Sequence, residues 1–256
     1  MMMTRTLLAL GLSALALAAC GKADTAADGG NATAAATAPG TAAPTAAAPA
    51  GGDWTQAVTK TADGGFRMGN PDAPVKLVEY GALSCSHCAV FEKEGLPELK
   101  AQFIAPGKVS YEFRNYMLNV LDVPAALLTR CRGAEPYFQL SEQMFANQMM
   151  LFDAVKGMTE AEQAQLQAMP PETQFLAWGK KLGLIDFFRV RGVPEAQATA
   201  CLTDKAAVEE LGKMSARATS EYELQGTPTF LIANKPVPNV ADWAALKPVL
   251  TKAVGA

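Results

Sequence analysis

The feature that most constrains this chain is a Cys-x-x-Cys motif at residues 85–88, together with the segments on either side of it. Segment 75–80 is rich in β-branched and aromatic residues, which predicts a buried strand, and segment 90–99 predicts a helix. A Cys-x-x-Cys at such a junction places its first sulfur at a helix N-terminus, where unpaired N–H groups and the helix dipole favour negative charge. The motif therefore predicts a redox-active pair of cysteines.

The N-terminal segment predicts export. Arg5 supplies a positive charge, and the apolar run over 7–19 is shorter than the ~20 residues that a membrane-spanning helix needs. The run ends in the sequence Leu-Ala-Ala before Cys20, which resembles a bacterial lipobox, where the cysteine is acylated. An ordinary signal peptide cleaved after Ala18 is the alternative. We expect a signal peptide over 1–19, and a lipid on Cys20 that anchors the protein to a membrane in the bacterial periplasm.

Residues 20–53 are predicted to form a disordered linker. After Cys20 and Lys22 they are mainly Ala, Thr, Gly, Pro and Asp, and this composition cannot bury enough apolar surface to fold. About 30 such residues give a root-mean-square reach of about 30 Å. The folded region is expected from residue 54 onward, and its length suits one domain with an insertion. A net charge of −3 without a basic cluster argues against a nucleic-acid partner.

The number of cysteines supports this interpretation. The chain has five, an odd number for an oxidising compartment. A lipid on Cys20 would leave the 85–88 pair together with Cys131 and Cys201. We expect the last two to form a structural disulfide, which would close a loop of about 70 residues and contribute up to ~4 kcal/mol. The alternative is two buried thiols that pack as small apolar residues.

The remaining pattern predicts a split α/β core. Segments 65–70 and 108–114 are expected to be strands, and a strand, a helix and a second strand over 75–114 make a parallel βαβ unit. The pattern is helical from about 122 to 222. Strand character returns at 229–233, and 242–254 is predicted to be a final amphipathic helix.

A second motif, Gly226-Thr227-Pro228, comes just before the late strand. Together with the Cys-x-x-Cys and the helical middle segment, it resembles the thioredoxin fold, and within that fold the DsbA-like disulfide oxidoreductases. The resemblance covers about 68–254. It implies an α/β thioredoxin fold with an inserted all-helical domain, in which segments 54–119 and 223–256 form the core and segment 120–222 forms the insertion.

The resemblance also implies site residues. Cys85 is expected to be the nucleophile and Cys88 the resolving cysteine of a redox-active disulfide. Pro228 is expected to follow a cis peptide bond, and Thr227 to present its backbone to substrate. Glu79 resembles the buried acid that these enzymes keep beneath the resolving cysteine. The alternative for Glu79 is a carboxylate at the end of a strand that reaches solvent.

His87 is the only histidine in the chain. We expect it to stabilise the Cys85 thiolate, and the alternative is a solvent-facing residue in the first helical turn. Ser86 departs from the proline that is commonest in the oxidases, which leaves the redox potential open. A Cys85 pKa near 5 would stabilise the reduced form at pH 7 by the equivalent of about two pKa units. This stabilisation makes the disulfide more oxidising by ~60 mV.

The predicted function is a periplasmic thiol:disulfide oxidoreductase that forms disulfides in exported proteins. We expect a monomer without a bound cofactor or metal, which acts on exported thiol proteins and is reset by a membrane redox partner. Two alternatives remain open. One is a periplasmic reductase of the same fold, and the other is a non-enzymatic module that binds soft metal through Cys85 and Cys88, with His87 as a further ligand.

Overall fold

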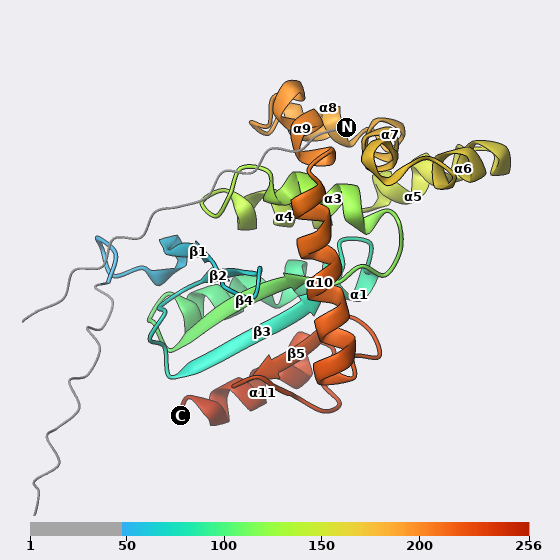
Figure 1. The fold of residues 1–256 in the computed structure, drawn as a ribbon. Helices are drawn as coiled ribbons and strands as arrows, with labels where there is room; N and C mark the ends of the chain where they lie inside the picture. Colours follow the sequence, from blue (N-terminus) through green and yellow to red (C-terminus); the bar gives the residue numbers. More distant parts are fainter. Residues whose placement is uncertain (1–47, 256) are drawn as a thin grey trace, which may run out of the picture. The chain divides into compact units, whose positions relative to one another are not determined.

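The computed structural model describes residues 48–255, and Figure 1 shows how their helices and strands are arranged. The predicted signal peptide, the lipidation site Cys20 and most of the predicted linker lie outside the described residues. Within residues 48–255, no helix is both long and apolar enough to cross a membrane.

The core is a six-stranded sheet with the order β1-β2-β4-β3-β5-β6. Its strands are β1 (Val58–Lys60), β2 (Phe66–Met68), β3 (Val75–Gly81), β4 (Val109–Asn115), β5 (Thr229–Ile232) and β6 (Lys235–Pro236). Only the central pair β3 and β4 is parallel, and the other neighbours are antiparallel. The parallel pair is joined through helices, as the βαβ pattern predicts.

Eleven α-helices and two short helical turns surround the described strands. They are η1 (Trp54–Gln56), α1 (Ser86–Glu94), α2 (Leu96–Leu99), η2 (Lys100–Ile104), α3 (Asp122–Arg130), α4 (Tyr137–Ala146), α5 (Met149–Lys156), α6 (Glu160–Gln167), α7 (Pro171–Lys181), α8 (Leu184–Arg189), α9 (Glu195–Leu202), α10 (Lys205–Tyr222) and α11 (Trp243–Ala253). Helices α3 to α10 all lie between β4 and β5 in the sequence. The thioredoxin fold with an all-helical insertion is therefore confirmed.

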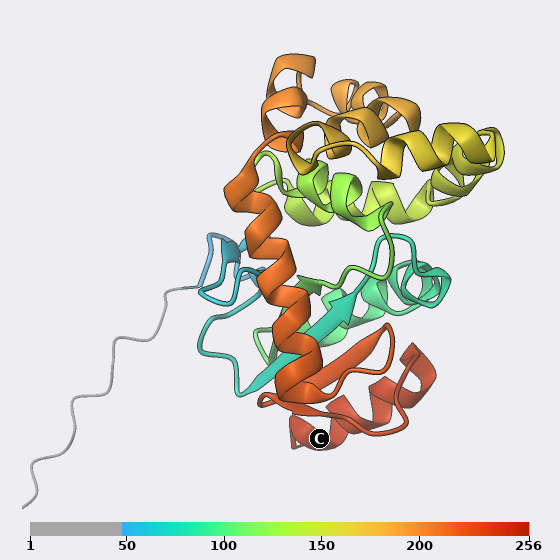
Figure 2. The same cartoon turned by 45° about the vertical axis from the view of Figure 1, so that its right-hand side comes forward.

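The two faces of the sheet are covered by different parts of the chain. Side chains alternate along β3, so Leu77 packs into the larger core with α1 and α11, whereas Val78 and Tyr80 pack against α10 on the other face. Figure 2 shows α10 running from the insertion down along the sheet. This long helix thus links the insertion to the core.

Several boundaries differ from the sequence-based expectation. The helix expected over 90–99 begins at Ser86 and is interrupted at Gly95, because Pro97 has no N–H to continue the hydrogen-bond ladder. Strands β1 and β6 were not expected, since strands of three and two residues carry too little pattern. The strand expected over 229–233 ends at Ile232, and a two-residue turn with positive φ at Ala233 and Asn234 leads into β6.

Cys131 and Cys201 meet inside the insertion. Their sulfur atoms are 2.01 Å apart, as in a disulfide, and they join the C-terminal end of α3 to α9. The two residues are 70 positions apart in the sequence. A cross-link that closes so long a loop restricts the unfolded chain, which is the source of the expected stabilisation.

Candidate active site

Cys85 occupies the N-cap position of α1. Its backbone is extended, with φ −82° and ψ 119°, and its Sγ accepts a hydrogen bond from the backbone N–H of Cys88 at 3.3 Å. Both cysteines are buried and unpaired in this structure, and Cys88 has no exposed surface. The sulfur of Cys85 is therefore held at the positive end of the helix dipole.

The two sulfurs differ in acidity. The pKa of Cys85 is lowered to about 5, above all by the hydrogen bond with the Cys88 side chain, and further by Thr227 and the backbone N–H groups of Cys88 and His87. Burial opposes this effect on Cys85. The pKa of Cys88 is raised well above its ordinary value by burial, by the hydrogen bond with Cys85 and by the charge of Glu79. Cys85 is thus the sulfur that can exist as a thiolate at neutral pH.

The Thr227–Pro228 peptide bond is cis and lies against the motif. Cys85 Sγ is 3.2 Å from the carbonyl oxygen of Thr227, although 142 positions separate the two residues. Thr229 Oγ1 donates a hydrogen bond to the carbonyl of Gly226 at 2.7 Å, which fixes the approach to β5. The structure therefore brings together the two motifs that the sequence singled out.

Glu79 lies on β3 with no exposed surface. Tyr111 Oη donates to its Oε2 at 2.6 Å, while its Oε1 has no partner in the described part of the chain. Burial raises the pKa of Glu79 to about 8, against the lowering effect of the Tyr111 hydrogen bond, and the charge of Cys85 raises it further. Glu79 is therefore buried and does not reach solvent, and its ionised form would raise the pKa of Cys88.

His87 is exposed in the first turn of α1. Its imidazole makes no hydrogen bond or ion pair with any residue from 48 to 255. Its contribution to the acidity of Cys85 comes from its backbone N–H. Within the same residues, no group of three or more His, Cys, Asp and Glu side chains is placed to hold a metal ion.

The turn that leads into α1 is held by residues that the sequence did not single out. Asp122 accepts hydrogen bonds from the backbone N–H of Ser84 at 2.8 Å and from its hydroxyl at 3.0 Å. Gln148 Nε2 donates to the carbonyl oxygens of Leu83 at 2.7 Å and Cys85 at 2.9 Å. Both Asp122 and Gln148 belong to the helical insertion, and no motif marks them.

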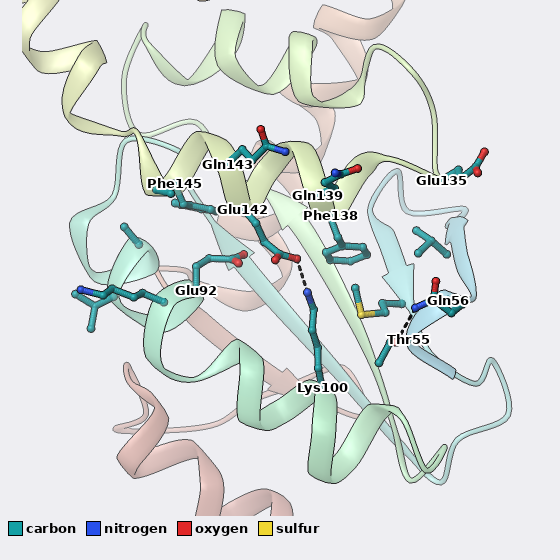
Figure 3. A pocket seen from close by; sticks show the side chains of 16 residues that line it. Thr55, Gln56, Glu92, Lys100, Glu135, Phe138, Gln139, Glu142, Gln143 and Phe145 are labelled. Carbon is teal, nitrogen blue, oxygen red and sulfur yellow. Dashed lines mark hydrogen bonds and ion pairs between the residues drawn. The ribbon is translucent and has the colours of Figure 1, made fainter. Parts of the chain in front are cut away.

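A groove of about 1030 Å³ lies beside α1, between that helix, η2, α4 and the first strands (Figure 3). Glu92 of α1 points toward Glu142 of α4, which forms an ion pair with Lys100. Both carboxylate oxygens of Glu92 are buried and lack a hydrogen-bond partner in the described structure. Burial raises the pKa of Glu92 well above its ordinary value, and the charges of Glu79 and Glu142 add to this.

These features can be compared with known proteins. A family model described as thioredoxin matches residues 61–252, which is most of the chain. The chain belongs to the thioredoxin family. The matched segment contains both cysteines of the motif, the helical insertion and the cis-proline turn, so the whole site lies on the family's scaffold.

The relatives that the chain resembles carry related names. A protein of Rickettsia bellii named as a protein-disulfide oxidoreductase is 26% identical over 64% of this chain and 55% of its own length. The chain thus spans about half the length of that curated relative. Disulfide bond formation protein D of Bacillus subtilis is 22% identical over 72% of this chain and 75% of its own. The crystal structure of a protein-disulfide isomerase from Novosphingobium aromaticivorans is 28% identical, covers 74% of this chain and 97% of its own, and has a TM-score of 0.71.

Proposed function

We propose that this chain is an exported thiol:disulfide oxidoreductase that introduces disulfides into other exported proteins. The observation that carries the proposal is the contrast between the two buried sulfurs of the motif. Cys85 has a pKa of about 5 at the N-terminus of α1, and Cys88 has a pKa well above its ordinary value. A stabilised Cys85 thiolate favours the reduced enzyme, so the oxidised form tends to pass its disulfide on.

The reaction begins from the Cys85–Cys88 disulfide. A substrate thiolate attacks Cys85 Sγ, the bond between the two enzyme sulfurs breaks, and its electron pair goes to Cys88. A second substrate thiolate then attacks the substrate sulfur of the mixed disulfide, and Cys85 leaves as a thiolate. The substrate loses two electrons and gains a disulfide, while the enzyme becomes the dithiol. The carbonyl of Thr227, 3.2 Å from Cys85, lies where the substrate backbone would pass.

Cys88 needs a proton when it leaves, because its raised pKa makes a free thiolate unfavourable. We propose that Glu79 supplies this proton. With a pKa of about 8, Glu79 keeps its proton at neutral pH, and it lies near enough to Cys88 for its ionised form to raise the pKa of Cys88. In the reverse reaction, the charged form of Glu79 would accept the same proton.

The cellular setting is also part of the proposal. The lipobox-like sequence that ends at Cys20 and the linker to residue 53 support a lipid anchor that holds the domain near a membrane in the periplasm. The dithiol formed in each cycle must be oxidised again. We propose a membrane-bound redox protein with its own disulfide as the partner that does so.

Oxidation of a reduced substrate tests the proposed direction of transfer. We expect the oxidised full-length chain to remove two thiols per enzyme molecule from a reduced, unfolded protein that has several cysteines, within minutes at pH 7. The Cys85→Ser variant is expected to remove none. A wild-type chain that leaves these thiols intact, yet speeds the reduction of a disulfide substrate when supplied with a reductant, would contradict the oxidase function and indicate a reductase.

A further inference from the structure

The turn between β3 and α1 places the reactive cysteine, and it is short of internal hydrogen bonds. Residues 82–85 are all buried, and the only hydrogen bond between their backbones joins Cys85 N–H to the carbonyl of Ala82 at 3.0 Å. Buried backbone groups that lack a partner are unfavourable. The N–H of Ser84 and the carbonyl of Leu83 therefore depend on side chains from elsewhere in the chain.

Gln148 supplies the donor that this turn lacks. Its side-chain Nε2 has two hydrogens, and it donates to the carbonyls of Leu83 at 2.7 Å and Cys85 at 2.9 Å. One side-chain amide thus joins the turn to Cys85, the N-cap residue of α1. Asp122 holds the Ser84 N–H between them, so the turn is fixed from both sides by the insertion.

Gln148 is itself held firmly. It lies between α4 and α5 and is 6% exposed. Its backbone N–H donates to the carbonyl of Phe145 at 3.2 Å, and its carbonyl accepts from Leu151 N–H at 3.0 Å. A buried side chain on a fixed backbone has few other conformations, so its amide provides a rigid reference for the turn.

The carbonyl oxygen of Cys85 connects the Gln148 hydrogen bond to the position of the reactive sulfur. The same oxygen accepts the N–H of Ala89 at 3.1 Å, which is the first backbone hydrogen bond of α1. Its direction sets how the N-cap residue meets the helix, and hence the 3.3 Å contact between Cys85 Sγ and Cys88 N–H. We propose that Gln148 is a positioning residue, whose side-chain amide holds the Leu83 and Cys85 carbonyls and so keeps the Cys85 sulfur against the N-terminus of α1.

This inference goes beyond the proposed function, because it concerns the state of Cys85 whichever way the electrons flow. It makes the helical insertion part of the redox site and not only a cover over it. Loss of the amide would free the turn and remove two donor hydrogens near Cys85. Both effects make the thiolate less favourable.

The test measures how the rate of Cys85 alkylation depends on pH in the reduced full-length chain. The extent of alkylation is read from the mass of the peptide that contains Cys85. Gln148→Met keeps an unbranched side chain of similar size and removes both hydrogen bonds. We expect the pKa of Cys85 to rise by about one unit, so that tenfold less thiolate is present at acidic pH. The reduction potential of the Cys85–Cys88 pair would then be about 30 mV more negative. Gln139→Met is the matched control, because Gln139 lies exposed on α4.

A Gln148→Met variant with the wild-type alkylation profile would overturn the inference, even if its melting temperature fell. If that variant does not fold, Gln148→Glu provides the same test. Its carboxylate accepts hydrogen bonds where the amide donated them, so the pKa of Cys85 should again rise, and an unchanged profile would again overturn the inference. Alkylation needs no protein substrate, so failure of the proposed function and failure of this inference are distinguishable.

Discussion

Cys88→Ser is expected to accumulate as a mixed disulfide with disulfide-containing substrates, joined through Cys85. In this variant Cys85 can still attack a substrate disulfide, because the introduced hydroxyl can donate a hydrogen bond to the Cys85 sulfur in place of the Cys88 thiol, and the other groups that lower the pKa of Cys85 remain. The enzyme then has no second sulfur with which to resolve the adduct. The measurement is a non-denaturing incubation at pH 7, followed by acid quenching, gel separation without reductant and peptide mass analysis.

Cys85→Ser serves as the counterpart and is expected to form no adduct. Cys88 has no exposed surface, and burial, which is the main cause of its raised pKa, keeps it protonated at pH 7 in this variant too. Adducts through Cys88 in this variant, or none through Cys85 in Cys88→Ser, would contradict the assignment of the nucleophile.

Replacing Glu79 by glutamine is expected to change how stability depends on pH. The folded-state pKa of Glu79, about 8, lies above the ordinary value of 4.5. Between these values the folded state binds more protons than the unfolded state, so the free energy of unfolding falls as pH rises through this window. Within this pH range Glu79 contributes up to about 1.4 kcal/mol per pH unit to the fall in the free energy of unfolding. Glu79→Gln should lose this contribution.

The experiment is best done on the oxidised full-length chain, by urea unfolding from pH 5 to pH 9, because burial, the main cause of the raised Glu79 pKa, acts there without the charge of Cys85. In the reduced chain, Cys85 has a lowered pKa, which gives the opposite slope between about 5 and 9 and would mask the effect. Glu94→Gln is a matched control, because Glu94 is exposed on α1. Equal slopes in wild type and Glu79→Gln would show that Glu79 is already charged at neutral pH in the folded protein.

The parts of the fold that the sequence predicted are those with a strong local pattern. The strand before the motif, the helix after it and the alternating strand that follows define the βαβ unit. The helix expected over 242–254 is α11, with Asp242 at its N-cap. Strands β1 and β6 are edge strands of three and two residues that pair with the strand next to them in sequence, and segments so short carry too little pattern to be recognised.

The site was predictable only in part, for a physical reason. Cys85, Cys88 and Pro228 are marked by motifs, whereas the burial of Glu79 depends on which strands and helices cover it. Glu92 had a usable signal, because it follows Cys88 by four residues and so shares its buried helix face. Gln148 had none, since its contact with the turn arises from the way in which the insertion packs.

The reduction potential of the Cys85–Cys88 pair tests the central claim most directly. The full-length chain is equilibrated with glutathione buffers at pH 7, and the oxidised fraction of this pair is read by differential alkylation and peptide mass, which separates it from Cys131–Cys201. We predict a potential above about −200 mV, in the range of dithiol oxidases. A potential below about −270 mV, at or under that of thioredoxin, would contradict the claim that a stabilised Cys85 thiolate makes this protein an oxidant.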